Sequence, residues 1–419
     1  MVFVIIPPYD ARAIMKASMT TRKHYNEATD LRTWIEVDAT AIRRNVQIFR
    51  RMIPAKCRLM AVVKSNAYGH DLVPFAREAV RCGADALAVD SITEAITLRK
   101  EGMNVPILIL GHILPHRIGE AINHNVSITA PDNATIETAI KAGKRAGVLP
   151  SLHIKVDTGM GRQGFVPGDL PALLALLKKN STSMRVDGLY THFAEAKNPA
   201  FPASTKKQLA LFEVWRSAFA DAGFTPTLHA AATGGTLLYP EAHFDMVRIG
   251  IGLYGIWPSY EVRAACEGRF NLTPVLSWKT RIGEIKKLPQ GSTVGYDCTE
   301  RLARNTTIAV IPVGYWHGYP RLLSSIGQVL IGGTRCRILG RVSMDMIVAD
   351  ITDLPKSARI GQEVVLLGTQ GAHTITADEL ALLAQTSPYE IVTRLNPLMA
   401  RIIRKQVSKQ KTIIEVGLH

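Results

Sequence analysis

The stretch at residues 60–71, MAVVKSNAYGHD, joins an apolar segment to a polar turn, and the interpretation of the whole chain depends on it. Apolar and β-branched residues at 59–63 predict a buried strand that ends at Lys64, and an apolar helical spacing resumes at 72–80. A lysine that leaves a dry strand is desolvated, which lowers its pKa and makes it a nucleophilic amine or a base. On this pattern alone, a lysine that simply extends into solvent is the commoner case, so the rest of the chain must decide.

Composition is that of a globular protein with an excess of basic residues. The 419 residues are 47% hydrophobic, which suits a large core in two or three domains. Lys and Arg number 50 against 35 Asp and Glu, a formal charge of +15 that could attract nucleic acid, anionic membranes or small anions. The basic residues are scattered, apart from a helix face at 43–51 and a tail from Arg401 to Lys411, without a zinc-finger, RNP-like or basic-zipper pattern. We therefore expect a small-molecule substrate and no nucleic-acid partner.

Cysteine usage and the N-terminus bear on metal binding and location. The five cysteines form no CxxC pair, so neither a disulfide framework nor a metal site is predicted, and a reducing cytoplasm fits best. The apolar run at 2–6 stops at Pro7 and Pro8, too short for a signal-peptide core, and no run approaches transmembrane length. We expect a cytoplasmic protein without membrane association. Residues 1–31 have little periodicity and are interpreted as a disordered extension or an overlong start of the chain.

Strands and helices alternate regularly in the first two thirds of the chain. After a short strand at 32–38, eight apolar strand candidates occur at 59–63, 86–89, 106–110, 126–129, 152–156, 186–190, 227–231 and 246–249. Amphipathic stretches separate them, for example at 91–101, 133–146, 170–179 and 205–222. Eight βα units predict an α/β fold with a (β/α)8 TIM-type barrel over residues 32–270, whose active site would lie at the C-terminal ends of the strands.

Polar residues follow the predicted strands where a barrel active site requires them. Lys64 follows the first strand, residues 157–162 the fifth, Thr191 and His192 the sixth, residues 233–235 the seventh, and Arg248 ends the eighth. Because the C-terminal ends of parallel strands meet at one rim, we expect these residues to lie together.

A second, mostly β domain is predicted over residues 271–407, and it may take in the strand at 32–38, with a basic tail at 408–419. Strands are expected at 277–285, 307–313, 328–330, 335–342, 346–351 and 363–367. One helix at 377–385 would be capped by Thr376. Turns at 294–296 and 313–320 place tyrosines beside glycines, which is unusual for purely structural turns.

The loops after the seventh and eighth strands suggest a phosphate site. Residues 232–235 and 250–252 combine glycines, which allow close backbone approach, with the hydroxyl of Thr233, at the usual phosphate position of this fold. A reactive lysine beside a phosphate site suggests pyridoxal 5'-phosphate (PLP) held as a Schiff base on Lys64. Arg248 could reach the pyridine nitrogen, although a salt-bridged structural arginine explains it equally well.

Eight motifs occur in order between about residues 32 and 404. They are VVKSNAYGHD (62–71), HIKVDTGMGRQG (153–164), THFA (191–194), MVRIGIGLYG (246–255), VGYDCT (294–299), VGYWHGYPR (313–321), RVSMDM (341–346) and YEI (389–391). Together they resemble the alanine racemase family. The resemblance implies a PLP-dependent barrel plus β domain that interconverts L- and D-alanine, supplies D-alanine for peptidoglycan, and works as a head-to-tail homodimer with shared active sites.

The resemblance implies a two-base mechanism. Lys64 would be the Schiff-base lysine and the base on the D side, and the partner subunit's Tyr296 the base on the L side. Inverting a stereocentre this way needs one acid/base group on each face of the planar carbanion. A tyrosine is normally too basic for this work, so its pKa must be depressed, which His192 and Arg248 could achieve.

The remaining site residues are implied in the same way. The phosphate would be held by Tyr68, Thr233, Gly250, Ile251 and Tyr389. Arg248 would contact the pyridine nitrogen and, because it keeps its proton, weaken the ring as an electron sink and favour reprotonation over transamination. Arg162 would bind the phenolic oxygen and the substrate carboxylate, together with the backbone amide of the partner subunit's Met344.

Further residues concern bracing and specificity. Lys155 matches a position that many relatives carbamylate to brace Arg162, Tyr315 and Tyr389 match residues that narrow the entrance, and Asp345 matches an acid behind it. The chain departs from the family at Ser65, Asp71, Thr233, Trp316-His317 and Asp297-Cys298. The changes beside Tyr296 and Tyr315 make strict alanine specificity less firm than racemisation.

Other functions fit parts of the pattern. A broader small amino-acid racemase acting on serine and alanine differs only at the entrance. A PLP-dependent decarboxylase shares the layout but usually sets an acid against the pyridine nitrogen, which Arg248 argues against. A non-enzymatic PLP-carrier protein resembles only the barrel half, so the second domain with Tyr296 argues against it.

Overall fold

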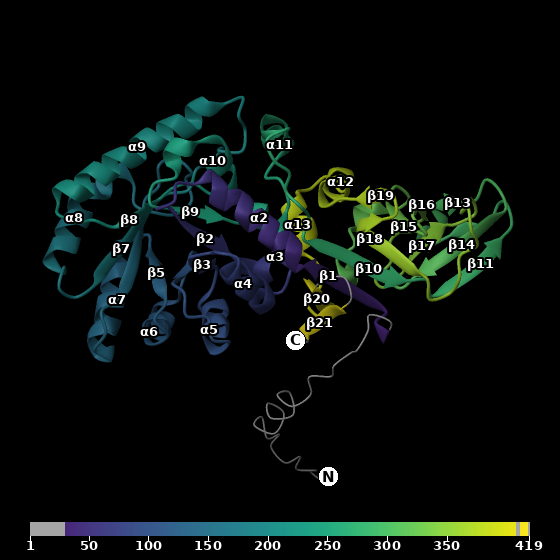
Figure 1. Cartoon of the computed structure of the whole chain (residues 1–419), viewed down its shortest axis with the longest axis horizontal. Coiled ribbons are helices and arrows are strands. Elements are labelled where there is room, and N and C mark those ends of the chain that lie inside the picture. The colour runs from purple at the N-terminus through teal and green to yellow at the C-terminus, as the bar shows by residue number, and fades with distance from the viewer. Residues whose placement is uncertain (1–29, 408–410, 418–419) are drawn as a thin grey trace, which may run out of the picture.

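The computed structural model describes residues 30–407 and 411–417, which form a helix-covered barrel beside an elongated β domain (Figure 1). Most of the predicted extension at 1–31 and part of the predicted tail at 408–419 lie outside the described residues. Within the described part of the chain, no helix is long and apolar enough to cross a membrane, and no cluster of His, Cys, Asp and Glu suits a metal ion.

The barrel consists of eight parallel strands, which pair within the described residues in the order β8-β7-β6-β5-β4-β3-β2-β9. They are β2 (Arg58–Val62), β3 (Ala86–Val89), β4 (Ile107–Ile109), β5 (Ser127–Ala130), β6 (Ser151–Lys155), β7 (Arg185–Tyr190), β8 (Thr227–His229) and β9 (Met246–Ile249). β2 pairs with both β3 and β9, so the last strand returns to the first. This parallel pairing confirms the predicted TIM-type barrel, and the apolar runs suit strands that are covered on both faces.

Helices cover the outside of the barrel (Figure 1). They are α2 (Ala39–Met52), α4 (Leu72–Arg81), α5 (Ile92–Lys100), α6 (Ile118–Asn123), α7 (Asn133–Ala146), α8 (Leu170–Lys179), α9 (Pro202–Asp221), α10 (Thr233–Leu238) and α11 (Tyr260–Cys266). Local signals set their ends: Asp38 caps α2, and Ser91 with Glu94 forms a capping box on α5.

The second domain is built on a mostly antiparallel sheet. In the described residues its order is β11-β14-β17-β16-β15-β18-β10-β1-β20-β21, with β19 paired to β18. The strands are β1 (Thr33–Asp38), β10 (Leu276–Arg281), β11 (Glu284–Leu288), β14 (Thr306–Ile311), β15 (Gln328–Ile331), β16 (Thr334–Leu339), β17 (Ile347–Asp350), β18 (Glu363–Gln370), β19 (His373–Ile375), β20 (Ala400–Val407) and β21 (Lys411–Gly417). β12 (Thr293–Val294) and β13 (Glu300–Arg301) form a separate pair. The first strand of the chain thus lies in the second domain's sheet.

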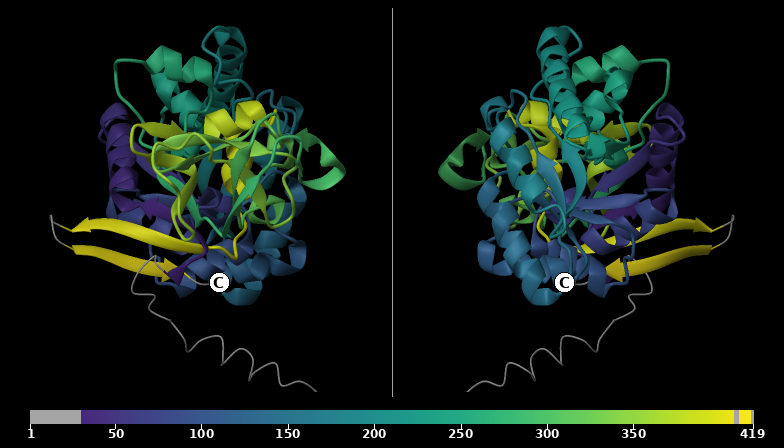
Figure 2. Two further views of the ribbon diagram at one scale, coloured as in Figure 1. Left: turned by 90° about the vertical axis from the view of Figure 1, so that its right-hand side faces the viewer. Right: turned by 90° about the vertical axis from the view of Figure 1, so that its left-hand side faces the viewer.

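Two features of this domain differ from the sequence prediction. The strand expected at 277–285 is two strands, because the amide of Ile282 bonds to Gln362 (2.9 Å) while the next amide, of Gly283, bonds to Val310 (2.9 Å) on another strand. The helix at 377–385 is α12 (Ala377–Leu383), with the predicted Thr376 cap, but α13 (Pro388–Thr393) and the β20–β21 pair were not predicted. β20 and β21 form a ribbon that projects from the body (Figure 2).

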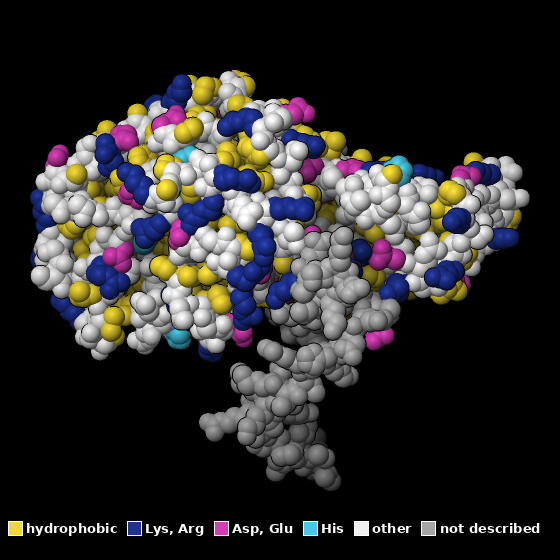
Figure 3. Space-filling view, viewed as in Figure 1, with side chains coloured by type: hydrophobic (Ala, Val, Ile, Leu, Met, Phe, Trp, Pro, Cys, Tyr) yellow, Lys and Arg dark blue, Asp and Glu magenta, His cyan; other side chains and the backbone are white. Residues whose placement is uncertain are grey.

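Hydrogen bonds join the two domains, and the charged side chains do not gather on one basic face in the view shown. The side chain of Asn45 on α2 donates to Leu253 (3.2 Å) and Thr273 (2.8 Å) and accepts from the Thr273 amide (2.9 Å), which ties the barrel to the connection between the domains. On the face shown in Figure 3, Lys and Arg are spread over both domains with acidic side chains between them.

Candidate active site

Lys64 lies directly after β2 and opens into a cavity of about 670 Å³ at the C-terminal ends of the barrel strands. Ten of the side chains or backbone segments proposed from the sequence line this cavity: Lys64, Tyr68, Lys155, Arg162, His192, Thr233, Arg248, Gly250, Ile251 and Tyr389. They come from five different strand ends and from α13 of the second domain, so the folded barrel brings together residues that are far apart in sequence. We name this space the Lys64 cavity.

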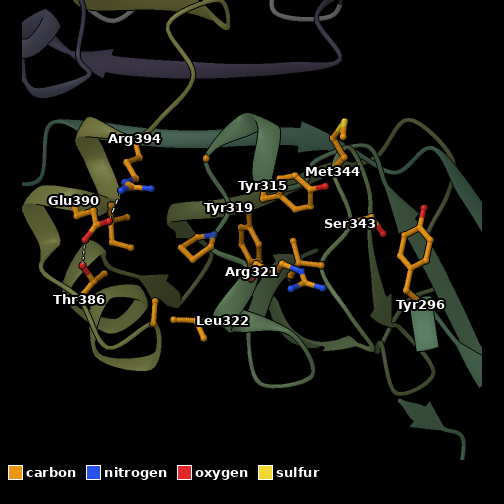
Figure 4. A pocket seen from close by; sticks show the side chains of 15 residues that line it. Tyr296, Tyr315, Tyr319, Arg321, Leu322, Ser343, Met344, Thr386, Glu390 and Arg394 are labelled. Carbon is orange, nitrogen blue, oxygen red and sulfur yellow. Dashed lines mark hydrogen bonds and ion pairs between the residues drawn. The ribbon is translucent and has the colours of Figure 1, made fainter. Parts of the chain in front are cut away.

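Four other predicted residues lie elsewhere in the chain. Tyr296, Tyr315 and Met344 line a second cavity of about 1060 Å³ in the β domain, shown in Figure 4, which we name the Tyr296 cavity. Asp345 is next to Met344 and lies 3.9 Å from His317. Tyr296 is 68% exposed and takes no part in the Lys64 cavity of its own chain.

The surroundings of Lys64 differ from the sequence prediction. Its side chain is 37% exposed and its Nζ lies 3.6 Å from a carboxylate oxygen of Asp90, so the expected desolvation is wrong for the single chain. The reason is that Lys64 lies just beyond the strand, where the cavity is open. Asp90 follows β3 directly, so the same strand-end rule could have found it.

The turn after Lys64 has an unusual backbone that the sequence did not indicate. Residues 65–68 all have positive φ values, of 56°, 54°, 49° and 51°, although none is glycine. Left-handed backbone costs about 1–2 kcal/mol for each such residue, so the surroundings must hold the turn in place. Glu94 accepts the Asn66 amide (3.1 Å), and the Asn66 side chain accepts the Leu72 amide (2.8 Å). We name residues 64–68 the lysine turn.

The predicted phosphate site is a cradle between three loops. The Thr233 hydroxyl accepts from the amides of Gly250 (3.2 Å) and Gly252 (3.4 Å), which fixes the two glycine-containing loops against each other. A Cβ atom on Gly250 would lie 2.8 Å from the Tyr68 hydroxyl, so only glycine leaves this space open. Burial, with the Asp90 charge nearby, raises the pKa of Tyr68 to about 12, so its hydroxyl stays protonated and can donate to an anion.

Arg248 is buried at the base of the Lys64 cavity, and both of its Nη atoms donate to neutral acceptors. Its Nη1 donates to Nδ1 (2.8 Å) and the carbonyl oxygen (2.8 Å) of His229. Its Nη2 donates to the carbonyl oxygens of Thr191 (2.7 Å) and Ala230 (2.9 Å) and lies 3.5 Å from Nδ1 of His192. Burial lowers the pKa of Arg248 to about 10, which still leaves it charged at neutral pH.

A pair of buried histidines behind Arg248 was missed by the sequence prediction. Since Arg248 can only donate, Nδ1 of His229 must be an acceptor, so neutral His229 carries its proton on Nε2 and donates it to Nδ1 of His153 (2.9 Å). Burial and the Arg248 charge hold the pKa of His229 well below its usual value, and burial lowers that of His153 to about 4. The pair lies inside strands, where no sequence signal distinguishes it from ordinary core residues.

Arg162 and Lys155 form the cationic side of the cavity. Asp157 accepts the backbone amide of Arg162 (2.9 Å), and also those of residues 159 and 160 (2.8 Å each), which fixes the loop that carries the exposed Arg162. Lys155 is buried and donates to the Gln163 side chain (2.9 Å). Burial, and then the charges of Arg162 and Arg248, lower the pKa of Lys155 to about 8.

The donor set and shape of this cavity fit PLP. A primary amine, a cradle that a single Cβ would fill and a buried arginine that cannot lose its proton occur in one space at the top of a barrel. This combination, with the attached β domain, defines the class of PLP-dependent barrel enzymes. The model of the family described as "Alanine racemase, N-terminal domain" matches residues 37–258, and that of its C-terminal domain matches residues 275–403.

Comparison with known proteins gives the family. The chain is 43% identical to an alanine racemase of Symbiobacterium thermophilum, over 88% of this chain and 96% of that one, and 40% identical to one of Methylacidiphilum infernorum, over 90% and 94%. The chain belongs to the alanine racemase family. It superposes on the Bacillus anthracis alanine racemase with bound L-Ala-P with a TM-score of 0.85 (36% identity; 92% and 97% covered). For the Bartonella henselae enzyme with covalently bound pyridoxal phosphate the TM-score is 0.80 (27% identity; 89% and 99% covered).

Proposed function

We propose that this chain is a PLP-dependent alanine racemase, an isomerase that interconverts L- and D-alanine. The observation that carries the proposal is the Lys64 cavity, where an amine, a phosphate cradle and Arg248 lie together. Lys64 would bind the cofactor covalently, Tyr68 and Thr233 with the Gly250 loop would hold its phosphate, and Arg248 would face its pyridine nitrogen. Bound there, PLP supplies the electron-withdrawing ring that makes the α-proton of an amino acid acidic.

Lys64 supplies one base in the chain's own cavity, and its neighbours Tyr68 and His192 are poorly suited to be the second. Tyr68 is a poor base because burial raises the pKa of its hydroxyl, which therefore keeps its proton and acts as a hydrogen-bond donor. Burial, and then the Arg248 and Arg162 charges, lower the pKa of His192 to about 3, so it is neutral and only weakly basic. We infer that Lys64 acts on one face of the α-carbon and the partner subunit's Tyr296 on the other.

The exposed surface around Tyr296 supports a homodimer. Tyr296 (68% exposed), Trp316 (57%) and Met344 (54%) present large apolar side chains near one another, which monomeric surfaces usually avoid. In a two-fold dimer each chain would give this surface to the other chain's Lys64 cavity. Tyr315 would narrow the entrance beside Tyr296, with Asp345 behind it, and the Met344 amide would help to bind the substrate carboxylate.

Arg162 and Lys155 would act on the substrate carboxylate and its support. Arg162 is exposed at the cavity wall, where it can meet a carboxylate directly. With its pKa lowered to about 8, Lys155 has more neutral amine at physiological pH than a free lysine, and neutral amine is the form that takes up carbon dioxide. We infer that Lys155 is carbamylated, so that its new carboxylate braces Arg162. Intact mass and peptide mapping in the presence and absence of bicarbonate would measure this.

The biological role we propose is the supply of D-alanine for peptidoglycan. We also propose that the two domains divide at about residue 270, with β1 belonging to the second domain. Entrance differences keep serine as a second substrate to be tested: Asp297 forms an ion pair with Arg341 (2.8 Å), next to Tyr296. That ion pair lies at one of the positions where the sequence departs from the family pattern.

The direct experiment is incubation of the purified protein with L-alanine and PLP in deuterium oxide. Equal amounts of both enantiomers, with deuterium at the α-carbon, are expected. Pyruvate without D-alanine, or an amine with release of carbon dioxide, would sink the racemase proposal. L-Serine run in parallel, with both enantiomers quantified, decides between strict and broad specificity.

A further inference from the structure

Arg401 on β20 is a buried arginine that none of the proposed chemistry uses. Parallel pairing with β1 places it opposite Ile35, and strand alternation puts it on the face away from Ala400 and Ile402, which pack with Trp34. Its side chain is 1% exposed. A buried guanidinium is costly unless its donors are satisfied, so its retention needs a physical reason.

The hydrogen bonds of Arg401 join two separate parts of the chain. Its Nε donates to the carbonyl oxygen of Gly69 at 2.8 Å, directly after the lysine turn. Its Nη1 donates to the carbonyl oxygens of residues 396, 397 and 399 at 3.2, 3.0 and 2.8 Å, and its Nη2 to that of residue 395 at 3.4 Å. One guanidinium therefore links the barrel turn that carries Lys64 to a loop of the second domain.

Gly69 is held at this junction from a second side. A Cβ atom at Gly69 would run into the carbonyl oxygen of Val392 on α13, so the turn lies directly on that helix. The same helix brings Tyr389 to the Lys64 cavity. Because residues 65–68 are all left-handed, the turn stays in place only if contacts such as these outweigh its strain.

Asp71 supplies the charge that a buried arginine requires. It is 2% exposed and has φ of 81°, a backbone region that glycine favours and an aspartate enters only at a cost. Burial lowers the pKa of Arg401, and the Asp71 charge opposes that shift, so the two groups are close enough to interact. Asp71 lies two residues after Gly69, on the segment that Arg401 holds, so its charge acts at the same junction.

We propose that Arg401, supported by Asp71, is a positioning residue that holds the lysine turn on the second domain and so sets Lys64 and Tyr68 for the cofactor. This assignment rests on the proposed function of the Lys64 cavity. The loop that Arg401 holds also contacts the edge of the Tyr296 cavity. The Asn396 side chain donates to the carbonyl oxygen of Trp316 at 3.0 Å, and Trp316 directly follows Tyr315, which lines that cavity. We name Arg401, with its hydrogen bonds to Gly69 and to residues 395–399, the clamp. The clamp connects the chain's own Lys64 to the segment that would complete its partner's site.

The test compares Arg401→Lys with Arg99→Lys in the holoenzyme. Arg99 is a matched control, since it too donates to backbone carbonyls, including those of Val105 (2.7 Å) and Asn125 (2.9 Å). It lies at the C-terminal end of α5, whereas the lysine turn contacts that helix near its start, at Glu94. Amide hydrogen exchange at residues 66–72 should quicken about tenfold in Arg401→Lys, with about tenfold faster loss of PLP on dilution. Arg99→Lys should leave both unchanged.

The outcomes separate the clamp from the proposed function. Unchanged exchange at residues 66–72 in Arg401→Lys, or the same change in Arg99→Lys, would overturn the clamp. Faster exchange with unaltered PLP retention would support the clamp but contradict the assignment of the Lys64 cavity to the cofactor. Asp71→Asn, which keeps a side chain that tolerates positive φ, should give the same pattern with a smaller change.

A wild-type measurement keeps the proposal testable if Arg401→Lys does not fold. In native-state exchange of the holoenzyme at low denaturant, amides at 66–72 and 395–401 should open together, as one cooperative unit. Separate opening, with the lysine turn exchanging before the loop, would overturn the clamp.

Discussion

The Lys64 cavity and the Tyr296 cavity are built in opposite ways. In the first, buried strand ends, the His229–His153 pair and the hydrogen bonds of Arg248 hold the base of the cavity in place. In the second, large aromatic and apolar side chains are exposed to solvent, and Tyr296 is 68% exposed. The difference teaches that one chain holds the residues proposed to bind the cofactor in a single cavity, whereas the two proposed bases, Lys64 and Tyr296, lie in separate cavities. We propose that a catalytic unit needs two copies of the chain, and the predictions below test that proposal.

Removing the amine of the first cavity should have the largest effect. Lys64→Ala is expected to lower racemisation at least about 10³-fold, because both covalent cofactor binding and one base are lost. The absorbance of the bound cofactor and the rate of D-alanine formation measure this. Lys56→Ala, at an exposed lysine before β2, is the control and should retain full activity.

Removing the hydroxyl of the second cavity should give a one-sided defect. Tyr296→Phe is expected to lower racemisation by about 10²–10⁴-fold, since a base on one face is lost. D-Alanine should still exchange its α-proton with deuterium oxide through Lys64, while L-alanine should not. Tyr260→Phe, at another exposed tyrosine, should behave as wild type. Equal loss of exchange for both enantiomers would contradict the two-base assignment.

Mixing the two inactive variants tests the sharing of sites. Random exchange of Lys64→Ala and Tyr296→Phe subunits makes half of the dimers hybrid, each with one complete site of two, so roughly one quarter of wild-type activity should return. Gel filtration coupled to light scattering establishes that dimers re-form. If mixed dimers stay inactive, each site is built from one chain and the dimer inference is wrong.

The electronic role of Arg248 predicts an intermediate effect. Arg248→Lys replaces a forked donor by a point charge and leaves the carbonyls of Thr191 and Ala230 poorly satisfied, so racemisation should fall about tenfold or more. If the arginine limits side reactions, the ratio of pyruvate to D-alanine should rise in the variant. Chiral chromatography with a pyruvate assay measures both, and an unchanged ratio would contradict that role.

The shape of the phosphate cradle predicts a smaller effect. Gly250→Ala places a methyl group 2.8 Å from the Tyr68 hydroxyl, which must shift, so the affinity for PLP should fall about tenfold. Gly119→Ala, on α6 where nothing lies within 4 Å of the added carbon, is the matched control. Equilibrium titration of both apo proteins with PLP decides whether the cradle holds the phosphate.

The buried Lys155 predicts a pH dependence of stability. Its pKa is lowered by burial from 10.5 to about 8, so between these values the unfolded chain binds more protons than the folded one. Stability should therefore rise with pH across this window, by up to about 3 kcal/mol from this group. Urea unfolding of the apo protein in buffer free of carbon dioxide measures it, and Lys155→Met should flatten the rise. An equal slope in both proteins would show that Lys155 does not titrate in this range.

The sequence predicted the barrel, the rim and most of the first cavity. Period-2 and buried apolar runs fixed eight strands to within one or two residues, and parallel strands must end at one rim, so Lys64 and Arg248 were placed together from chain order alone. The order of the eight motifs along the chain indicated the family.

Only the tertiary structure decided what surrounds these residues. The left-handed lysine turn, the His229–His153 pair and the buried Arg401 depend on contacts between segments far apart in sequence, such as 69 with 401, and local pattern carries no signal for them. The open setting of Lys64 was decided in the same way, because exposure depends on what other chains or loops cover it. Sequence periodicity determined where the strands end, and packing between the domains determined how Lys64 and the turn after it are held there.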